Sequence, residues 1–260
     1  MRRVGWFAGC VTALVAVCLA VPLLVVIAAS FNPTNELMVP PRGVSLAWYI
    51  NIFRRPVFLA SFRFSVALAV VSTACSLVMG GLCAFVLVRY RFPGRQMFAT
   101  ALMSPLIVPQ VVLGMSLLIF LSTIGIVSSV IGLALLHVML TVPYTTRVLT
   151  AALTRFRESL EDAAVIHGAP RPLAFLLVTL PSIKPGLVAA AIFAFVTSFD
   201  NFTASQFLVW DRTTLPVEIY SYIRTENDPT VAAISTLLVL GTVAIVVLVE
   251  RWVGLETLTE

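Results

Sequence analysis

Long apolar stretches dominate the sequence, and shorter polar segments separate them. An α-helix needs about 20 apolar residues to cross the hydrocarbon core of a bilayer. Six stretches meet or approach this length, and they predict transmembrane helices over residues 7–29, 64–88, 98–121, 127–149, 187–207 and 231–249. The pattern therefore predicts an all-α polytopic membrane protein with six transmembrane helices.

The composition favours the same class of protein. Hydrophobic residues make up 60% of the chain and charged residues 11%, whereas soluble domains contain about 25% charged residues. The first stretch follows Arg2 and Arg3, as in a signal peptide, but its apolar part exceeds the usual signal core of about 7–15 residues, which favours a retained span. The net charge of +5 does not indicate nucleic acid as a partner, because arginines gathered on one side of a bilayer explain it.

The basic residues are distributed unequally between the two sides of the predicted bundle. Eleven of the 17 Lys and Arg residues fall on the side that holds both termini and the segment 158–185, and six fall on the other side. Cytoplasmic loops of membrane proteins are enriched in Lys and Arg. We therefore expect both termini and this segment to lie in the cytoplasm.

The segment 158–185 is a polar interruption with helical character. Ser159 and Asp162 have the spacing of a capping box, which starts a short helix. Gly168 can end that helix in the left-handed conformation, and the prolines two and four residues later prevent its continuation. A second short helix is expected to end near Pro181. The two helices form either an ordinary loop at the membrane surface or a part that a partner protein grips.

This segment resembles the signature loop of the permease subunits of ABC importers, which reads Glu-Ala-Ala, three residues, Gly, nine residues and Ile-x-Leu-Pro. The residues that fall on this spacing are Asp162, Ala163, Ala164, Gly168, Val178, Leu180 and Pro181. Asp162 replaces the family's Glu and Val178 its Ile, so charge and shape are kept. In that family the loop is a coupling helix that sits in a groove of a cytoplasmic ATPase. The resemblance implies this role for Ser159, Glu161, Asp162, Ala163, Ala164, Gly168, Ala169, Leu180 and Pro181.

Asp200 is the one acidic residue in the interior of a predicted span. It follows Leu187 by 13 residues, which places it about 20 Å into the membrane at about 1.5 Å per residue. An ionised carboxylate at that depth costs at least about 2.5–3.5 kcal/mol, so it should face a partner or a water-filled cavity. The partner is either a cationic substrate or an arginine of this chain or a companion subunit.

The residues around Asp200 resemble the Ser-Phe-Asp-x-Phe motif of polyamine-importer permeases, whose carboxylate lies on the substrate path. The resemblance implies that Phe199, Asn201 and Phe202 also line this path. It extends over nearly the whole chain and includes the segments 32–63, 89–95 and 210–230. The chain resembles the second permease subunit of a spermidine/putrescine-type importer of the type I ABC class, with its MetI-like architecture.

That resemblance implies partners. They are a paralogous permease subunit, two cytoplasmic ABC ATPase subunits, a periplasmic or lipid-anchored solute-binding protein, and the lipids of a bacterial inner membrane. The chain has no Gly-x-x-x-x-Gly-Lys-Ser/Thr loop, so ATP-Mg is expected on the ATPase and no cofactor on this chain. It also has no catalytic triad or zinc-ligand spacing, so we expect a subunit without catalytic or metal-binding residues.

Some residues inside the predicted spans allow two interpretations. Pro105 and Pro109 are expected to kink the third span, either for packing or beside a translocation path. His137 is expected to be a hydrogen-bonded packing residue. The four cysteines, all within spans, are expected to fill small apolar positions.

The polar connections are also open to more than one interpretation. A helix that begins near Ser45 is expected to rest at the external membrane interface. The arginines of the cytoplasmic turn 89–95 are expected only to set the topology. Glu218, Glu226 and Asp228, in the second external segment, either contact a docked binding protein or are solvated.

Other functions stay open at this point. The substrate could be an opine, an amino acid, thiamine or a metal chelate. A secondary transporter would need an ion-coupling site and usually an internal repeat, and in a scaffold subunit Asp200 would be dispensable. The expected organisation is a first helix with an external segment over 1–60, a permease domain over 61–252 that contains the coupling loop 155–186, and a short cytoplasmic tail over 253–260.

Overall fold

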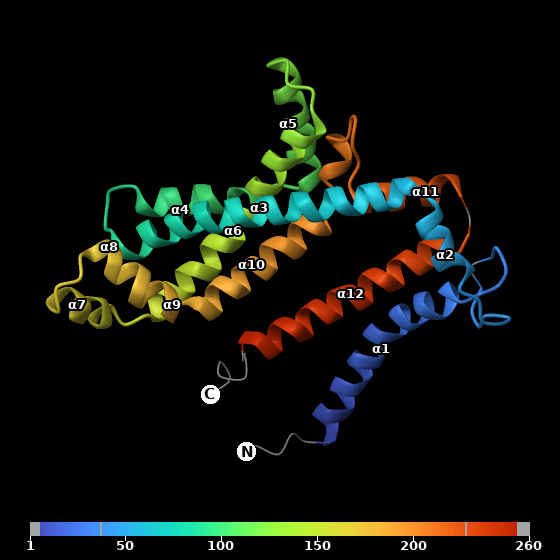
Figure 1. Cartoon of the computed structure of the whole chain (residues 1–260), viewed down its shortest axis with the longest axis horizontal. Coiled ribbons are helices and arrows are strands. Elements are labelled where there is room, and N and C mark those ends of the chain that lie inside the picture. Colours follow the sequence, from blue (N-terminus) through green and yellow to red (C-terminus); the bar gives the residue numbers. More distant parts are fainter. Residues whose placement is uncertain (1–5, 37, 227, 254–260) are drawn as a thin grey trace. The chain divides into compact units, whose positions relative to one another are not determined.

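The computed structural model describes residues 6–36, 38–226 and 228–253, and this part of the chain is helical, with no strand (Figure 1). It divides into two compact units. Among the described residues, one unit holds residues 6–60 and 218–253, and the other holds residues 61–217. The helices α3 (Pro56–Arg89) and α11 (Leu215–Thr225) contribute to both units. The predicted tail 253–260 lies, after its first residue, outside the described residues.

The first unit pairs the first and last predicted spans. The helices α1 (Trp6–Ser30) and α12 (Thr230–Val253) pack together, and both confirm the predicted positions. The short helix α2 (Ala47–Arg54) also contacts α12. Trp48 Nε1 donates a hydrogen bond of 2.6 Å to the carbonyl of Asn32, and Ser30 and Tyr49 share one of 2.7 Å. These bonds fix α2 to the end of α1.

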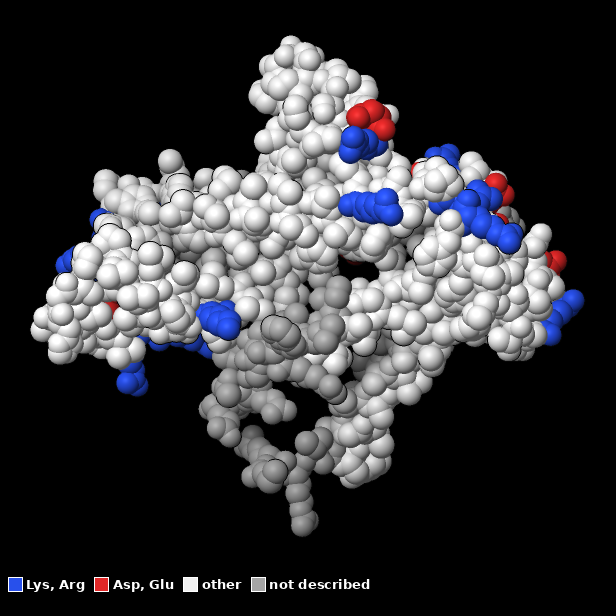
Figure 2. Space-filling view, viewed as in Figure 1, with Lys and Arg blue, Asp and Glu red and all other residues white. Residues whose placement is uncertain are grey.

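The second unit is built around α3, α6 (Ser129–Arg155) and α10 (Lys184–Phe199), which pack closely. A Cβ atom on Gly80 would overlap Thr145, and one on Gly186 would lie 2.6 Å from the Cβ of Ala152. Small residues at these crossings let the backbones approach, as is usual between membrane helices. The sequence of α3 has no charged residue between Arg63 and Arg89, as a lipid-facing span requires. Figure 2 shows a broad uncharged surface along the part of the second unit where Figure 1 draws α3.

Two predicted spans are not continuous helices. The span expected over 98–121 consists of α4 (Arg95–Met103), the 3₁₀ turn η1 (Ser104–Leu106) and α5 (Gln110–Thr123), with a bend of 98°. The kink expected from Pro105 and Pro109 is therefore a complete break. Pro109, which cannot donate a backbone hydrogen bond, lies just before the first residue of α5.

The span expected over 187–207 ends early. Helix α10 stops at Phe199, and the residues after it form a turn that leads into the 3₁₀ turn η3 (Ser205–Phe207). Asp200 therefore lies at the C-cap of a helix, and the prediction that it lies in a helix interior is wrong. The side chain of Asn201 accepts hydrogen bonds from the backbone N–H and the hydroxyl of Ser205. Such local bonding competes with the helical ladder.

In the described part of the chain, three helices are long and apolar enough to cross a membrane unaided, and there are up to five spans if each bent pair counts as one. The second bent pair is Arg171–Ser182 with Lys184–Phe199, at 71°. Within α12, the described stretch Thr230–Ala244 is a shorter apolar helix. Cys10, Cys18 and Cys75 are exposed on the surface of the chain, and Cys83 is half-buried.

Candidate coupling elbow and substrate cavity

The elbow consists of α7 (Glu158–Ile166) and the helical segment Arg171–Ser182, which contains α8 (Arg171–Ala174), the π-turn η2 (Phe175–Thr179) and α9 (Leu180–Ser182). In Figure 1 it lies at the end of the second unit where α3 ends. Arg157 is the N-cap of α7 and makes no capping hydrogen bond with its side chain. The predicted capping box is therefore wrong, because Ser159 lies inside the helix. Glu158 and Glu161 in the first turn stabilise the helix through its dipole instead.

The predicted end of α7 is confirmed. Gly168 has φ +95°, a conformation that favours glycine. The N–H of Ala169 bonds to the carbonyl of Ala164 at 3.1 Å, and the N–H of Gly168 bonds to Val165 at 2.9 Å. This pair of bonds is a Schellman motif, which satisfies carbonyls at the end of the helix.

One face of α7 points outward. Ser159, Asp162, Ala163 and Gly168 are exposed, together with two large apolar side chains that sequence reasoning missed. These are Leu160, 51% exposed, and Ile166, 83% exposed. Apolar residues on an otherwise polar loop are the signal that could have identified them. An exposed apolar surface rimmed by polar groups is typical of a protein contact.

The opposite face of α7 is bound to the rest of the unit through Glu161. Its carboxylate pairs with the Arg89 guanidinium at 2.5 Å and accepts a hydrogen bond of 2.6 Å from Thr179 Oγ1. Arg89 also pairs with Glu158 at 3.1 Å. Arg89 and Glu161 are only 14% and 16% exposed. The prediction that Arg89 serves topology alone is therefore wrong, because it holds α7 to the end of α3.

The rest of the predicted coupling set completes the elbow. Ala164, Ala169 and Leu180 are half-buried, and Pro181 is exposed. The π-turn lies immediately before the Leu180–Pro181 pair, and the N–H of Leu180 bonds to the carbonyl of Phe175. Proline in a helix removes one hydrogen bond and crowds the preceding turn, and a widened turn relieves that crowding. The helix ends after Ser182, close to the predicted end at Pro181.

A cavity of about 360 Å³ lies where α10 ends and α5 begins, and it includes Asp200, Asn201 and Phe202 of the predicted substrate path. The remaining residues of its lining are Gln110, Val196, Thr197 and Thr203. Phe199 stacks on Phe195 with a centroid distance of 5.8 Å and does not belong to the lining. Sequence reasoning missed Gln110, which lies 91 positions from the Asn201 it contacts.

The electrostatics at this cavity favour a cation. The carboxylate of Asp200 is exposed, and no Lys or Arg of the described residues forms an ion pair with it. An arginine within the described part of the chain is therefore not its partner. Asp200 also lies at the C-terminus of α10, where the helix dipole adds partial negative charge.

A buried hydrogen-bond network supports the cavity from behind. His137 on α6 is 2% exposed, and its ring nitrogens bond to Ser198 Oγ at 2.7 Å and Ser205 Oγ at 2.9 Å. Asn201 Nδ2 donates a bond of 3.2 Å to Gln110 Oε1. The prediction that His137 is a hydrogen-bonded packing residue is confirmed. Within the described residues, its ring forms hydrogen bonds with Ser198 and Ser205 and none with Asp200.

Comparison with known proteins decides the family of this membrane protein. Residues 76–253 match the family described as the binding-protein-dependent transport system inner membrane component. The chain belongs to this family. It is a non-catalytic, multi-pass permease subunit of an inner membrane, and ATP hydrolysis in such systems belongs to separate ATPase subunits. The secondary-transporter and scaffold alternatives are thereby excluded.

Two relatives and one solved structure resemble the permease over most of its length. The putrescine transport system permease protein PotI of Escherichia coli (strain K12) is 30% identical over 86% of this chain and 82% of its own. The spermidine/putrescine transport system permease protein PotC of Haemophilus influenzae is 29% identical over 88% and 90%. A chain in the crystal structure of a bacterial ABC transporter that imports the acidic polysaccharide alginate has a TM-score of 0.72 and 15% identity over 97% of this chain and 98% of its own, which shows the shared fold.

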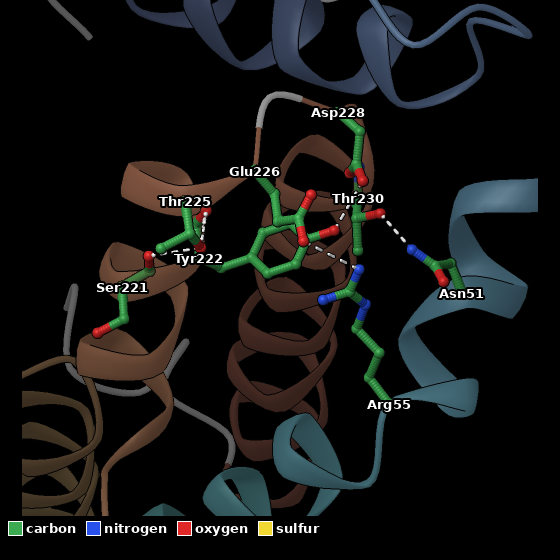
Figure 3. A network of polar contacts seen from close by, with 8 residues as sticks. All are labelled: Asn51, Arg55, Ser221, Tyr222, Thr225, Glu226, Asp228 and Thr230. Carbon is green, nitrogen blue, oxygen red and sulfur yellow. Dashed lines mark hydrogen bonds and ion pairs between the residues drawn. The ribbon is translucent and has the colours of Figure 1, made fainter.

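A second polar network orders the first unit of the permease (Figure 3). The Arg55 guanidinium lies 4.7 Å from the centre of the Tyr222 ring and 3.6 Å from Glu226. Tyr222 donates a hydrogen bond of 2.7 Å to Asp228, which also accepts one of 2.8 Å from the Thr230 N–H. Burial acts to raise the pKa of Asp228, but the hydrogen bonds from Thr230 and Tyr222 outweigh it and hold that pKa below its ordinary value. Asp228 and Glu226 are therefore engaged within the chain.

Proposed function

We propose that this permease passes a polyamine-class cation, such as putrescine or spermidine, through the inner membrane as one of two permease subunits of an ATP-driven importer. The relatives that share most of its length are named for putrescine and spermidine. The observation that carries the proposal is the cavity beside Asp200, whose carboxylate forms no ion pair within the described residues and lies at the C-terminus of α10. A linear diamine or triamine matches this site because it offers charge and N–H donors along a narrow chain.

The cavity lining suits such a ligand chemically. The carboxylate of Asp200 supplies the charge, and the side-chain carbonyl of Gln110, held in place by Asn201 Nδ2, supplies an acceptor at the rim. Phe202 supplies an aromatic surface, and cations are attracted to the faces of aromatic rings. In this proposal Asp200, Asn201 and Phe202 line the path, and Phe199 supports the end of α10 by stacking on Phe195.

The elbow is the proposed contact with the cytoplasmic ATPase. The outward face of α7 offers Ser159, Asp162, Ala163 and the apolar Leu160 and Ile166 to a groove. The inward face is fixed by the Arg89–Glu161 pair, so a movement of α7 would be passed to α3. ATP-Mg, bound on the ATPase, would favour one of two transmembrane arrangements and its release the other.

We also propose how the permease lies in the membrane and which subunits surround it, with the orientation that the distribution of Lys and Arg predicts. Both termini and the elbow face the cytoplasm, the second permease is a paralogue, two ATPase subunits lie beneath the pair, and a periplasmic or lipid-anchored binding protein delivers the solute. We also propose the domain organisation 1–60, 61–252 with the loop 155–186, and 253–260 for the permease.

Asp200→Asn tests the substrate proposal. The change keeps the shape of the side chain and removes its charge. In proteoliposomes with the co-purified complex and saturating binding protein, putrescine uptake should fall at least about tenfold, which corresponds to about 1.4 kcal/mol. Glu36→Gln is the matched control, because it removes an exposed carboxylate from the external segment. Equal putrescine uptake by the two variants would remove Asp200 from the path.

A further inference from the structure

His137 joins the two ends of the loop that forms the cavity. Ser198 lies in the last turn of α10, and Ser205 is the first residue of η3. The ring contacts both hydroxyls, at 2.7 and 2.9 Å, from the buried face of α6. Residues 199–204, which include the cavity residues Asp200, Asn201, Phe202 and Thr203, therefore lie between two hydrogen bonds of one imidazole.

The hydrogen-bond partners determine which ring nitrogen carries the proton. Asn201 Oδ1 accepts the backbone N–H of Ser205 at 3.2 Å, so this atom is an oxygen and must also accept the Ser205 hydroxyl at 2.9 Å. Because the Ser205 hydroxyl proton is used on Asn201, its oxygen accepts from His137, and Nε2 is the protonated nitrogen. The ring is buried and has no ion-pair partner among the described residues, so it is neutral, and Nδ1 accepts from Ser198.

The chain of hydrogen bonds continues to the cavity. Asn201, whose oxygen is held by Ser205, donates from Nδ2 to Gln110 Oε1 at 3.2 Å. Gln110 is the first residue of α5, directly after the break in the third predicted span. The sequence of bonds from His137 Nε2 through Ser205 and Asn201 thus fixes the rim of the cavity on both sides, while the bond to Ser198 fixes only the end of α10.

We infer that His137 is a positioning residue for substrate passage, and that it acts through Ser205 and Asn201 on the cavity loop and Gln110. The inference rests on the proposed function, because it concerns the cavity assigned there to a polyamine cation. His137 touches no substrate in this scheme. It holds the loop so that the Asp200 carboxylate and the Gln110 carbonyl keep their places around the passing cation.

Two substitutions of His137 separate its two hydrogen bonds, which we call the Ser205 arm and the Ser198 arm. Glutamine places an amide N–H near the position of Nε2 and preserves the bond to Ser205, whereas asparagine reaches only the position of Nδ1 and preserves the bond to Ser198. Ser205→Ala removes the same arm that His137→Asn removes. Ser72→Ala is the control, because this hydroxyl is also fully buried in the second unit but forms no hydrogen bond in the described structure.

The experiment measures putrescine uptake and ATP hydrolysis in proteoliposomes that contain the complex purified with its partner subunits and saturating binding protein. The amount of putrescine transported per ATP hydrolysed should fall about tenfold in His137→Asn and Ser205→Ala, a loss equivalent to one buried hydrogen bond. It should stay within about twofold of wild type in His137→Gln and Ser72→Ala. A role in folding alone would lower uptake and hydrolysis together and leave their ratio unchanged.

The outcomes separate this inference from the function on which it rests. A wild-type ratio in His137→Asn and Ser205→Ala would overturn the role of His137 while wild-type uptake still supported the polyamine permease. An equal loss in His137→Gln and His137→Asn would also overturn it, because the Ser205 arm would then have no special role. Absence of putrescine uptake by the wild-type complex would refute the proposed function itself.

Discussion

Glu161 differs from the other acidic residues of α7 in the environment of its carboxylate. Its side chain is 16% exposed and contacts Arg89 and Thr179, whereas Glu158 is 59% exposed. A hydrogen bond to a charged group contributes about 1.5–3 kcal/mol, and removing one partner leaves the other charge buried. Glu161 therefore holds α7 against the rest of the second unit, whereas the exposed residues on the outward face of α7 form the proposed contact with the ATPase.

Glu161→Gln should destabilise the permease. The neutral amide keeps the shape but leaves the Arg89 guanidinium without its buried counter-charge, so the free energy of unfolding should fall by about 1–3 kcal/mol. Thermal unfolding of the purified permease measures the change. Asp162→Asn is the matched control, because its carboxylate is exposed on the same helix and forms no ion pair within the described residues. Equal unfolding temperatures for the two variants would contradict the role of Glu161.

Residues differ in how visible their roles are in the sequence. Asp200 can be identified from a window of a few residues, because a charge inside an apolar run is unusual and costly. Arg89 cannot, because its partner Glu161 lies 72 positions away and the local turn explains the arginine by topology alone. Gln110 and Ser205 are equally hidden, since ordinary polar residues gain a role only from what the fold places opposite them.

Gly168 is the residue on which the shape of the elbow element depends. Its φ of +95° is unfavourable for any residue with a Cβ, although a Cβ there would meet no atom within 4 Å. Gly168→Ala should therefore strain the backbone by about 1–2 kcal/mol without a clash. The Schellman bonds from Gly168 and Ala169 should weaken, and their amide hydrogens should exchange faster with deuterium.

Gly241→Ala provides the control for that experiment. Gly241 lies inside α12 and also has no atom within 4 Å of an added Cβ, but its φ is not positive. Alanine is favoured over glycine in a helix by about 1 kcal/mol. This variant should keep or increase protection of its own helix and leave the elbow unchanged. Wild-type exchange at residues 163–169 in Gly168→Ala would show that the left-handed turn does not determine the elbow.

At the scale of elements, apolar length predicts some spans better than others. The helices α1 and α12 agree with the predicted ranges, because nothing in these stretches opposes a continuous helix except Pro22, which α1 accommodates. The third and fifth predicted spans fail because average hydropathy does not register a break. Proline before Gln110, and the side-chain bonding of Asn201 to the backbone of Ser205, end the helices inside apolar surroundings.

Both breaks meet at the cavity, which gives them a common physical reason. Non-helical backbone at membrane depth is tolerated where it is buried in protein or lines a water-filled cavity. Gly114 on α5 packs so closely on the turn before η3 that an added Cβ would lie 2.5 Å from the carbonyl of Ala204. The two interrupted elements therefore support each other beside Asp200 and Gln110.

At the scale of the whole molecule, the charge distribution of the second unit indicates its orientation. Arg89, Arg155, Arg157, Arg171 and Lys184 lie at the elbow end of its helices. The opposite end carries Arg63 and Arg212, and Arg212 lies beside Asp211, whose pKa is lowered chiefly by its hydrogen bond with Ser129. Lys and Arg concentrate on the cytoplasmic side of a membrane protein. The elbow is therefore expected in the cytoplasm, where an ATPase can reach it.

Cysteine labelling of intact cells tests this orientation. In a variant with the four native cysteines replaced by alanine, Ser159→Cys on α7 should react with a membrane-impermeant maleimide only after the inner membrane is opened. Ser221→Cys on α11 should react from the periplasm in spheroplasts, because both positions are exposed but lie on opposite predicted sides. Leu240→Cys on α12, 56% exposed and within the apolar stretch, should react under neither condition. Labelling of Ser159→Cys from the periplasm would place the elbow outside the cell and refute its contact with an ATPase.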